Sequence, residues 1–290
     1  MSLLSCGLII PGITNDFVDG TNHLRTHYSF RHRITARVSK LLDGYVYTIR
    51  HGLAKGLRRK GGLGWVPSWV GGATSETAET AFLGRLDLRD KVVFDVGGFQ
   101  GVLAMFFARL ATQVVVYEPN PSSRERLQDN LALNAFTNVT VRPVGVGEKN
   151  EELELVFDPL MAGGASANAN VAGQIRSSAR NLRVETITIV SLDDEVADGV
   201  PAPDFVKIDV EGMELGVLKG MRKLLRSHQP VLCIEMHGAT MEEKRANSRA
   251  VVDELVESGY TNILHIETQQ QVTPETSDIA ARGHLHCRSA

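Results

Sequence analysis

The chain has 290 residues, of which 43% are hydrophobic and 22% charged, and its formal net charge at pH 7 is −3. This length suits one large α/β domain with an accessory segment, or two small domains, and the composition is typical of a globular protein with a sizeable core. The slightly acidic balance gives no reason to expect binding of nucleic acid or of an acidic membrane. No apolar run approaches the roughly 20 residues of a membrane span.

Positive charge is nevertheless concentrated in one segment. Residues 21–60 contain ten Lys and Arg residues and a single acid, Asp43, so that the segment carries +9 and the remainder of the chain −12. Such a segment is either a solvated basic face or a surface that meets an anionic substrate or partner.

The cysteines indicate a reducing compartment. Cys6, Cys233 and Cys287 are odd in number and widely spaced, so they form neither a disulfide framework nor a paired metal motif. The start, MSLLSCGLIIPG, is apolar but short and has no basic flank, so we expect neither a signal peptide nor a membrane span. A cytoplasmic protein is therefore expected, with homo-oligomerisation left open.

The first 74 residues are predicted to form an accessory segment that covers the substrate, followed by one domain over residues 75–290. Residues 31–50 have mixed helical spacing, which favours a helix or helix-turn, and the Gly-rich, basic residues 51–72 are typical of a loop. Residues 75–88, SETAETAFLGRLDL, are predicted to be a helix capped by Thr74 or Ser75.

From Lys91 onward, predicted strands alternate with predicted helices, which is the pattern of a parallel sheet. Strands are expected at 92–97, 114–119, 138–147, 204–210, 230–238, 260–267 and 283–289, and helices at 102–111, 122–134, 213–225 and 249–259. Residues 152–157 and 182–190 alternate with period two and are predicted to form an added antiparallel pair. The small, polar residues 158–182 between them are predicted to be a mobile loop and a lid over the acceptor.

The first strand ends in a glycine-rich turn, DVGGFQG, in which Asp95 is followed by Gly97, Gly98 and Gly101. At the carboxyl end of a parallel strand, such a turn lets a ligand lie against bare backbone and next to the free N–H groups of the following helix. Glu118 ends the second strand, where an acid can accept hydrogen bonds from a ribose diol. Both S-adenosylmethionine and nicotinamide-adenine dinucleotide carry such a ribose.

The spacing of these residues favours S-adenosylmethionine. A dinucleotide turn usually reads G-x-G-x-x-G, whereas this chain has D-x-G-G-x-x-G. The carboxylate of Asp95 would repel a pyrophosphate, but it suits the ammonium end of a methionine moiety. The Val144–Gly147 turn after the third strand is where an adenine edge would meet the backbone. The predicted cofactor residues, including neighbours in the same turns, are Asp95, Gly97, Gly98, Gln100, Gly101, Glu118, Pro119, Val144, Gly145 and Asp209.

Six segments in order, FDVGGFQG, VYEPNP, NVTV, VSLDD, DFVKIDVEGMELGVLKG and PVLCIEMH, closely resemble the FkbM family of methyltransferases over about residues 75–265. The family usually has Ala-Asn-Ile where this chain has Gly98, Phe99 and Gln100, so Gln100 stands in for the family's asparagine. The resemblance implies a class I, Rossmann-like α/β fold with a seven-stranded, mostly parallel sheet whose last strand is antiparallel. It also implies methyl transfer, mostly to hydroxyl oxygens of sugars or secondary metabolites.

Four proton acceptors or hard ligands follow the fourth and fifth strands: Asp209, Glu211, Glu235 and His237. An alcohol is a poor nucleophile until it loses its proton, so a base or a metal is expected there. His237 is the predicted general base because its unperturbed pKa is about 6.5. Asp209 would orient the hydroxyl or accept its proton, while Glu211 could also simply favour the dipole of the next helix. Lys207 would pair with a carboxylate below the site, or else extend its ammonium group to the surface.

A divalent cation held by Asp209, Glu235 and His237 is a further option, although the sequence leaves metal dependence undecided. Two alternatives to a methyltransferase remain. A NAD-dependent oxidoreductase would need the dinucleotide turn and a second catalytic domain, neither of which is recognisable. A non-catalytic nucleotide-binding or scaffold protein could retain the same fold, because fold does not determine function. The acceptor itself is predicted to be a small molecule, anionic if the basic segment contacts it.

Overall fold

The computed structural model describes residues 44–61, 77–158, 165–178 and 181–289. Most of the predicted accessory segment therefore lies outside the described residues, as does part of the predicted lid.

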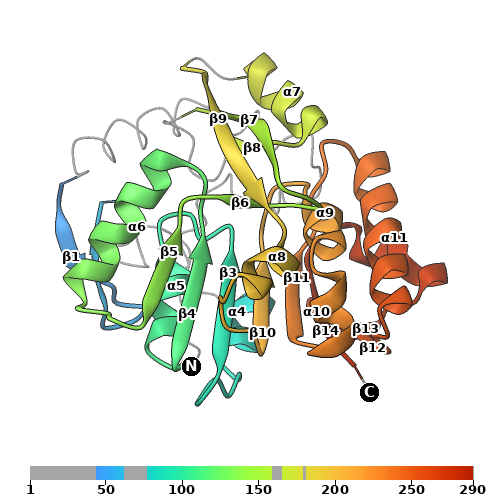
Figure 1. The fold of residues 1–290 in the computed structure, drawn as a ribbon, viewed down its shortest axis with the longest axis horizontal. Helices are drawn as coiled ribbons and strands as arrows, with labels where there is room; N and C mark the ends of the chain where they lie inside the picture. Colours follow the sequence, from blue (N-terminus) through green and yellow to red (C-terminus); the bar gives the residue numbers. More distant parts are fainter. Residues whose placement is uncertain (1–43, 62–76, 159–164, 179–180, 290) are drawn as a thin grey trace, which may run out of the picture.

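A large mixed sheet forms the centre of the protein (Figure 1). Its strands run in the order β13-β12-β14-β11-β10-β3-β4-β5. The neighbours from β11 to β5 are parallel, whereas β14 is antiparallel to both β11 and β12. This arrangement confirms the predicted fold class, and the two-residue β13 is an additional edge strand. The bounds are β3 Val92–Val96, β4 Gln113–Tyr117, β5 Val139–Arg142, β10 Phe205–Ile208, β11 Val231–Glu235, β12 Asn262–His265, β13 Gln270–Gln271 and β14 His284–Arg288.

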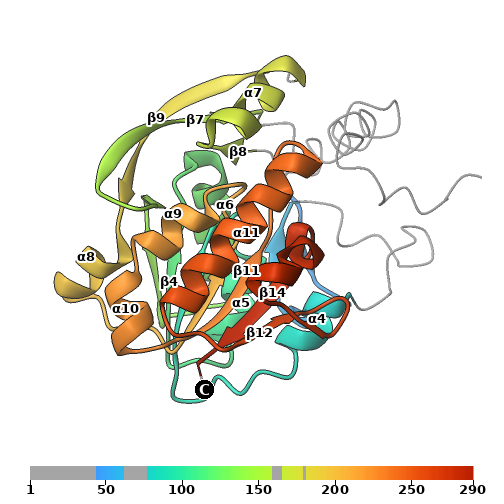
Figure 2. The ribbon, with the colours of Figure 1, turned by 90° about the vertical axis from the view of Figure 1, so that its right-hand side faces the viewer.

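The central strands are almost wholly apolar because helices cover both faces of the sheet. Successive side chains point to opposite faces, so Phe94 and Ile208 belong to one core and Val93 and Phe205 to the other. The first core is closed by α8 Leu192–Ala197, α9 Glu214–Lys219, α10 Arg222–Ser227, α11 Met241–Glu257 and the 3-10 helix η1 Pro274–Ala281. The second is closed by α4 Ala78–Leu83, α5 Val102–Ala108 and α6 Pro121–Leu133. Figure 2 shows α11 and α4 from the β14 side of the sheet.

A smaller sheet lies beyond the carboxyl ends of the central strands (Figure 1). It contains β6 Gly145–Val146, β9 Arg183–Val190, β7 Glu151–Phe157 and β8 Ala165–Ser166, and the predicted antiparallel pairing of β7 with β9 is confirmed. The prediction that 158–182 is entirely loop was wrong in its described part, because it contains β8 and α7, Ala169–Ser178. Val171, Ala172 and Ile175 pack against Val156 of β7, and these few apolar positions give α7 its buried face.

The described part of the accessory segment is a hairpin, β1 Val46–Thr48 with β2 Arg58–Lys60, where a helix and a loop were predicted. Its β2 strand is fixed to α6 by two asparagines. Asn130 accepts a hydrogen bond from the Lys60 N–H at 2.8 Å and donates one to the Gln100 carbonyl at 2.8 Å. Asn134 both accepts from the N–H of Arg58 and donates to its carbonyl. The hairpin therefore lies against the glycine-rich turn.

Two predicted helix limits also differ in the structure. Helix α4 is capped by Thr77, whose side chain accepts a hydrogen bond from the Thr80 N–H, rather than by Thr74 or Ser75, which lie outside the described residues. The predicted helix 213–225 is divided into α9 and α10 around Gly220. A Cβ at this glycine would lie 1.9 Å from the carbonyl oxygen of Gly147, so the close approach of that loop requires glycine there.

Candidate active site

The glycine-rich turn joins β3 to α5 at the carboxyl edge of the large sheet. Gly97 has φ +90°, and a Cβ there would lie 1.8 Å from the carbonyl oxygen of Asp209. Gly101 has φ +80° and precedes the first residue of α5. Gly98 packs so closely on Val116 that a Cβ would lie 2.1 Å from its side chain. The glycines are thus needed for backbone conformation and close packing, and Gly97 places the turn directly against the residue that follows β10.

Two buried carboxylates border this turn. Glu118 accepts hydrogen bonds from the N–H groups of Phe99 at 2.7 Å and Asn120 at 2.8 Å, yet burial raises its pKa to about 7. Burial likewise raises the pKa of Asp95 to about 7, and one of its carboxylate oxygens has no hydrogen-bond partner among the described residues. A buried unpartnered acceptor is costly, which makes Asp95 a residue that a hydrogen-bond-donating or cationic ligand would satisfy.

The remaining predicted cofactor residues surround the same edge. The Oε1 atom of Gln100 accepts a hydrogen bond from Arg59 at 2.9 Å, so the side chain predicted to replace the family's asparagine is engaged by β2. Gly145 is the first residue of β6. A Cβ added to it would lie 2.6 Å from the side chain of Ile189 and 3.7 Å from that of Pro119. Val144 is partly buried against the first core. None of these contacts involves a ligand, so their cofactor roles stay predictions.

The four predicted acceptor-site residues are brought together beyond β10 and β11. The Nε2 atom of His237 lies 3.8 Å from Asp209, 3.8 Å from Glu211 and 3.5 Å from Glu235. The three carboxylate side chains are 33–36% exposed, whereas His237 is 16% exposed. Burial is the main cause that raises the pKa of Asp209 to about 6 and that of Glu211 to about 7. The cluster is therefore open to a substrate on one side and supported by protein on the other.

The loop that carries Glu211 is held by the smaller sheet. Ser166 of β8 donates a hydrogen bond to the Glu211 carbonyl at 2.8 Å, and Asn168 donates to the Gly212 carbonyl at 2.9 Å. Glu211 itself has φ +49°, a left-handed conformation that is uncommon for a residue with a Cβ. It precedes α9 by three residues rather than opening the helix, so the alternative explanation by the helix dipole does not apply to it.

Sequence reasoning missed Glu214, which is fully buried beneath His237. Its Oε1 atom lies 2.8 Å from the Nδ1 atom of His237, and its Oε2 accepts a hydrogen bond from Asn247 at 2.8 Å. Burial opposes a charged imidazole, but the hydrogen bond with Glu214 and the carboxylate of Glu235, 3.5 Å from Nε2, outweigh it and raise the pKa of His237 well above its usual value. A protonated imidazole has no lone pair to accept a proton, so this environment argues against His237 as the general base.

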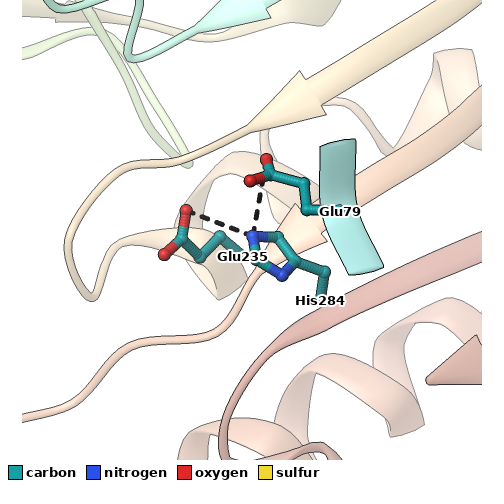
Figure 3. A group of neighbouring side chains, drawn as sticks. All are labelled: Glu79, Glu235 and His284. Carbon is teal, nitrogen blue, oxygen red and sulfur yellow. Dashed lines mark ion pairs between the residues drawn. The ribbon is translucent and has the colours of Figure 1, made fainter. Parts of the chain in front are cut away.

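Lys207 pairs with carboxylates as predicted, although with more of them. Its ammonium group is fully buried and lies 3.4 Å from Glu79, 3.6 Å from Glu235 and 3.9 Å from Asp209. Nearby, the Nε2 atom of His284 lies 3.5 Å from Glu79 and 3.4 Å from Glu235 (Figure 3). Glu79 comes from α4 and His284 from β14, and nothing in their local sequences distinguishes them from ordinary surface positions. Only the strand order brings them to Glu235.

Residues 95–261 match the model of the methyltransferase FkbM domain, which is more than half of the chain. The chain belongs to the FkbM methyltransferase family. The match lies within residues 75–265, the region over which the sequence resembles the family. It includes both the glycine-rich turn and the carboxylate cluster.

Two curated relatives of this FkbM-family protein are methyltransferases by name. The hexuronic acid methyltransferase AglP of Haloferax volcanii is 34% identical over 150 residues, which are 51% of this chain and 56% of the relative. Methyltransferase 1 of Beauveria bassiana is 27% identical over 146 residues, which are 46% of this chain and 59% of the relative. The aligned region thus spans somewhat over half the length of each relative.

Solved structures give weaker likenesses. An FkbM methyltransferase from Methylobacillus flagellatus KT has 22% identity and a TM-score of 0.44, covering 71% of this chain and 45% of its own. Fibrillarin from Aeropyrum pernix, solved with S-adenosyl-L-methionine, has 11% identity and a TM-score of 0.39, covering 70% and 68%. Within the described ranges, no helix is both long and apolar enough to cross a membrane.

Proposed function

We propose that this protein transfers the methyl group of S-adenosylmethionine to an oxygen atom, with a hydroxyl of a sugar or secondary metabolite as the acceptor. The observation that carries the proposal is the direct contact between Gly97 and Asp209. It joins a glycine-rich turn, suited to a nucleoside ligand, to a partly open cluster of carboxylates, suited to a hydroxyl. Membership of the FkbM family supports the same reaction class.

The cofactor would lie along the carboxyl ends of β3 and β4. Glu118 already binds two backbone N–H groups, and each of its oxygens retains a lone pair for a ribose hydroxyl. Asp95 offers, beside the turn, a carboxylate oxygen that no described residue hydrogen-bonds. The glycines let the backbone approach the ligand, while Gln100, Pro119, Val144 and Gly145 would complete the cradle. When bound, S-adenosylmethionine supplies an electrophilic methyl group on a sulfonium sulfur.

The acceptor hydroxyl would enter from the open side of the cluster. In an in-line displacement, the new bond from oxygen to the methyl carbon forms as the bond from carbon to sulfur breaks, and the hydroxyl proton passes to a carboxylate of the cluster. Asp209, Glu211 and Glu235 are the groups in position to accept it. Holding the hydroxyl in line with the methyl group is worth up to about 7–11 kcal/mol of the barrier.

An anionic acceptor is the class that we favour. Arg58, Arg59 and Lys60 of β2 lie near the turn, and AglP, by its name, acts on hexuronic acids, which are anionic sugars. Lys60 is already paired with Asp129 at 2.6 Å, so Arg58 and Arg59 are the better candidates to attract a carboxylate. Charge reversal at both arginines should raise the KM for an anionic acceptor and leave that of a neutral acceptor unchanged. Equal KM values in wild type and variant for the anionic acceptor would refute this part.

Calorimetric titration with S-adenosylhomocysteine tests the proposal at its first step. We expect micromolar affinity in the wild-type protein, lost in Glu118→Ala, with NADH giving no binding in a parallel titration. Binding of NADH would support the oxidoreductase alternative. Failure of both ligands to bind would favour the scaffold protein and refute the methyltransferase.

A further inference from the structure

Two groups of three side chains in the described residues bring one ligand atom each within 4.8 Å of the others. The first group is Glu79, Glu235 and His284 (Figure 3). The buried ammonium of Lys207 already lies 3.4 Å from Glu79 and 3.6 Å from Glu235. A metal ion would have to share this space with a fixed positive charge. The first group is therefore neutralised by a residue of the protein itself.

The second group, Asp209, Glu211 and His237, differs in this respect. Lys207 approaches only the Oδ2 atom of Asp209, at 3.9 Å, whereas the Oδ1 atom faces His237. Among the described residues, no N–H or O–H group donates a hydrogen bond to the carboxylate of Asp209 or of Glu211. Two carboxylate oxygens and the Nε2 atom of His237 thus converge on one space, and a cation bound there would replace the proton that the raised pKa of His237 places on Nε2.

His237 is held in the orientation of a metal ligand by residues outside this group. Its Nδ1 atom is bound to Glu214, which is fully buried and receives further hydrogen bonds from the Gly212 N–H and from Asn247. A carboxylate that accepts the Nδ1 proton fixes the orientation of the ring, and it leaves Nε2, once that atom has lost its own proton, as the nitrogen that can bind a cation. That nitrogen is the atom that faces Asp209 and Glu211.

We propose that Asp209, Glu211 and the Nε2 atom of His237 bind a divalent cation of the Mg²⁺ and Mn²⁺ class. Both ions accept carboxylate oxygens, and three protein ligands leave positions of an octahedral site open for water and substrate. Adjacent ligands of such an ion lie roughly 3 Å apart, so the observed 3.8 Å separations need only small side-chain rotations. The third ligand is Glu211 rather than the Glu235 considered from the sequence, because Asp209, Glu211 and His237 each bring a ligand atom within 4.8 Å of the others, whereas Glu235 does so with Glu79 and His284.

The position of the ion gives it a role in the reaction, and this role rests on the proposed methyl transfer. Asp209 contacts Gly97 through its main chain, so the ion would lie beside the cofactor turn. A hydroxyl of the acceptor bound to the ion would lose its proton more readily, with Glu235, the carboxylate of the cluster that is not a ligand, in position to accept it. The ion would stabilise the negative charge on the oxygen that attacks the methyl group. The ion itself is neither oxidised nor reduced.

The test measures Mn²⁺ binding to the wild-type protein in the absence of cofactor and acceptor. Binding is monitored by electron paramagnetic resonance and by calorimetry. We expect one site that Mg²⁺ competes for. Glu211→Gln should weaken Mn²⁺ binding by more than 10-fold, and Glu214→Gln by about 10–100-fold through loss of the His237 orientation. The matched control is Glu79→Gln, which removes a carboxylate from the neighbouring group and should change the affinity less than twofold.

Glu211→Asp distinguishes direct coordination of the cation from long-range electrostatic attraction. The variant keeps the negative charge but shortens the side chain by one methylene, so that the carboxylate no longer reaches the ion. Weakening by this variant supports a ligand role, and wild-type affinity would refute it. Absence of Mn²⁺ binding to the wild type, or equal losses in Glu79→Gln and Glu211→Gln, would also overturn the proposal. S-adenosylhomocysteine affinity, measured on the same samples, shows that each variant is folded. It also keeps the two proposals apart: Mn²⁺ binding without cofactor binding would retain the metal site and refute the methyltransferase.

Discussion

Asn130 is the clearest point at which a single side chain connects the β1–β2 hairpin to the glycine-rich turn. The side chain of Asn130 is fully buried on α6. It accepts a hydrogen bond from the main-chain N–H of Lys60 and donates one to the main-chain carbonyl of Gln100, both at 2.8 Å. Asn130→Ala removes both hydrogen bonds and leaves a main-chain N–H and a carbonyl without their partners. Each loss costs about 1–3 kcal/mol when the orphaned group is shielded from water.

Lys60 and Gln100 are only partly buried, so water can replace part of what is lost. We therefore expect the free energy of unfolding to fall by about 2–4 kcal/mol in total, with a weaker affinity for S-adenosylhomocysteine because Gln100 lies within the turn. Urea denaturation gives the first quantity from the midpoint at unchanged m value, and calorimetry gives the second.

The matched control is Gln128→Ala, two residues earlier on the exposed face of α6, which should change stability by less than about 0.5 kcal/mol. If Asn130→Ala were no more destabilising than Gln128→Ala, the hydrogen bonds between β2, α6 and the turn would not matter to stability. The reasoning that the hairpin is fixed to the cofactor site through Asn130 would then be refuted.

Three further predictions concern the turn, the buried lysine and the His284 pair. Gly97→Ala should abolish binding of S-adenosylhomocysteine, because its Cβ would lie 1.8 Å from the Asp209 carbonyl oxygen; wild-type calorimetry would contradict this. Lys207→Met should lower the free energy of unfolding, measured in urea, by about 3–5 kcal/mol, because the carboxylates around Lys207 lose their buried cation. Adding Glu79→Gln to this variant should restore part of the lost stability, and no recovery would argue against the pairing of Lys207 with Glu79. Burial opposes a charged His284, but the carboxylate of Glu235, 3.4 Å away, and the hydrogen bond with Glu267 raise its pKa to about 9. The hydrogen bond with His284 in turn outweighs burial and lowers the pKa of Glu267. Lys207 and Glu79 also face His284. Stability from His284 is thus present below its unfolded pKa of about 6.5 and lost as pH rises through about 9, and that from Glu267 is lost as pH falls below about 4.3. Urea midpoints across pH should show both losses reduced in Glu267→Gln, and an unchanged pH profile would count against the pair.

The sequence by itself determined the sheet and the edge of the sheet at which the predicted site residues lie. The alternation of apolar strands with helices from Lys91 onward depends on neighbouring residues, so it could be recognised locally. The same holds for the glycine-rich turn, for Glu118 and for the four side chains after β10 and β11. Parallel strands bring their carboxyl ends to one edge, and topology therefore made it possible to expect Asp209 and His237 close together.

Only the tertiary structure decided which charged groups meet. Glu79, Lys207 and His284 come from α4, β10 and β14, and each becomes a partner of Glu235 only once those elements lie side by side. Asn130 and Asn134, polar residues at the end of α6, are held by main-chain groups of β2 and, for Asn130, of the turn. Glu214 changes the expected chemistry of His237 because it is buried against the imidazole. Local sequence carries periodicity and turn signals, whereas hydrogen-bond partners and the pKa of a buried group depend on residues distant along the chain.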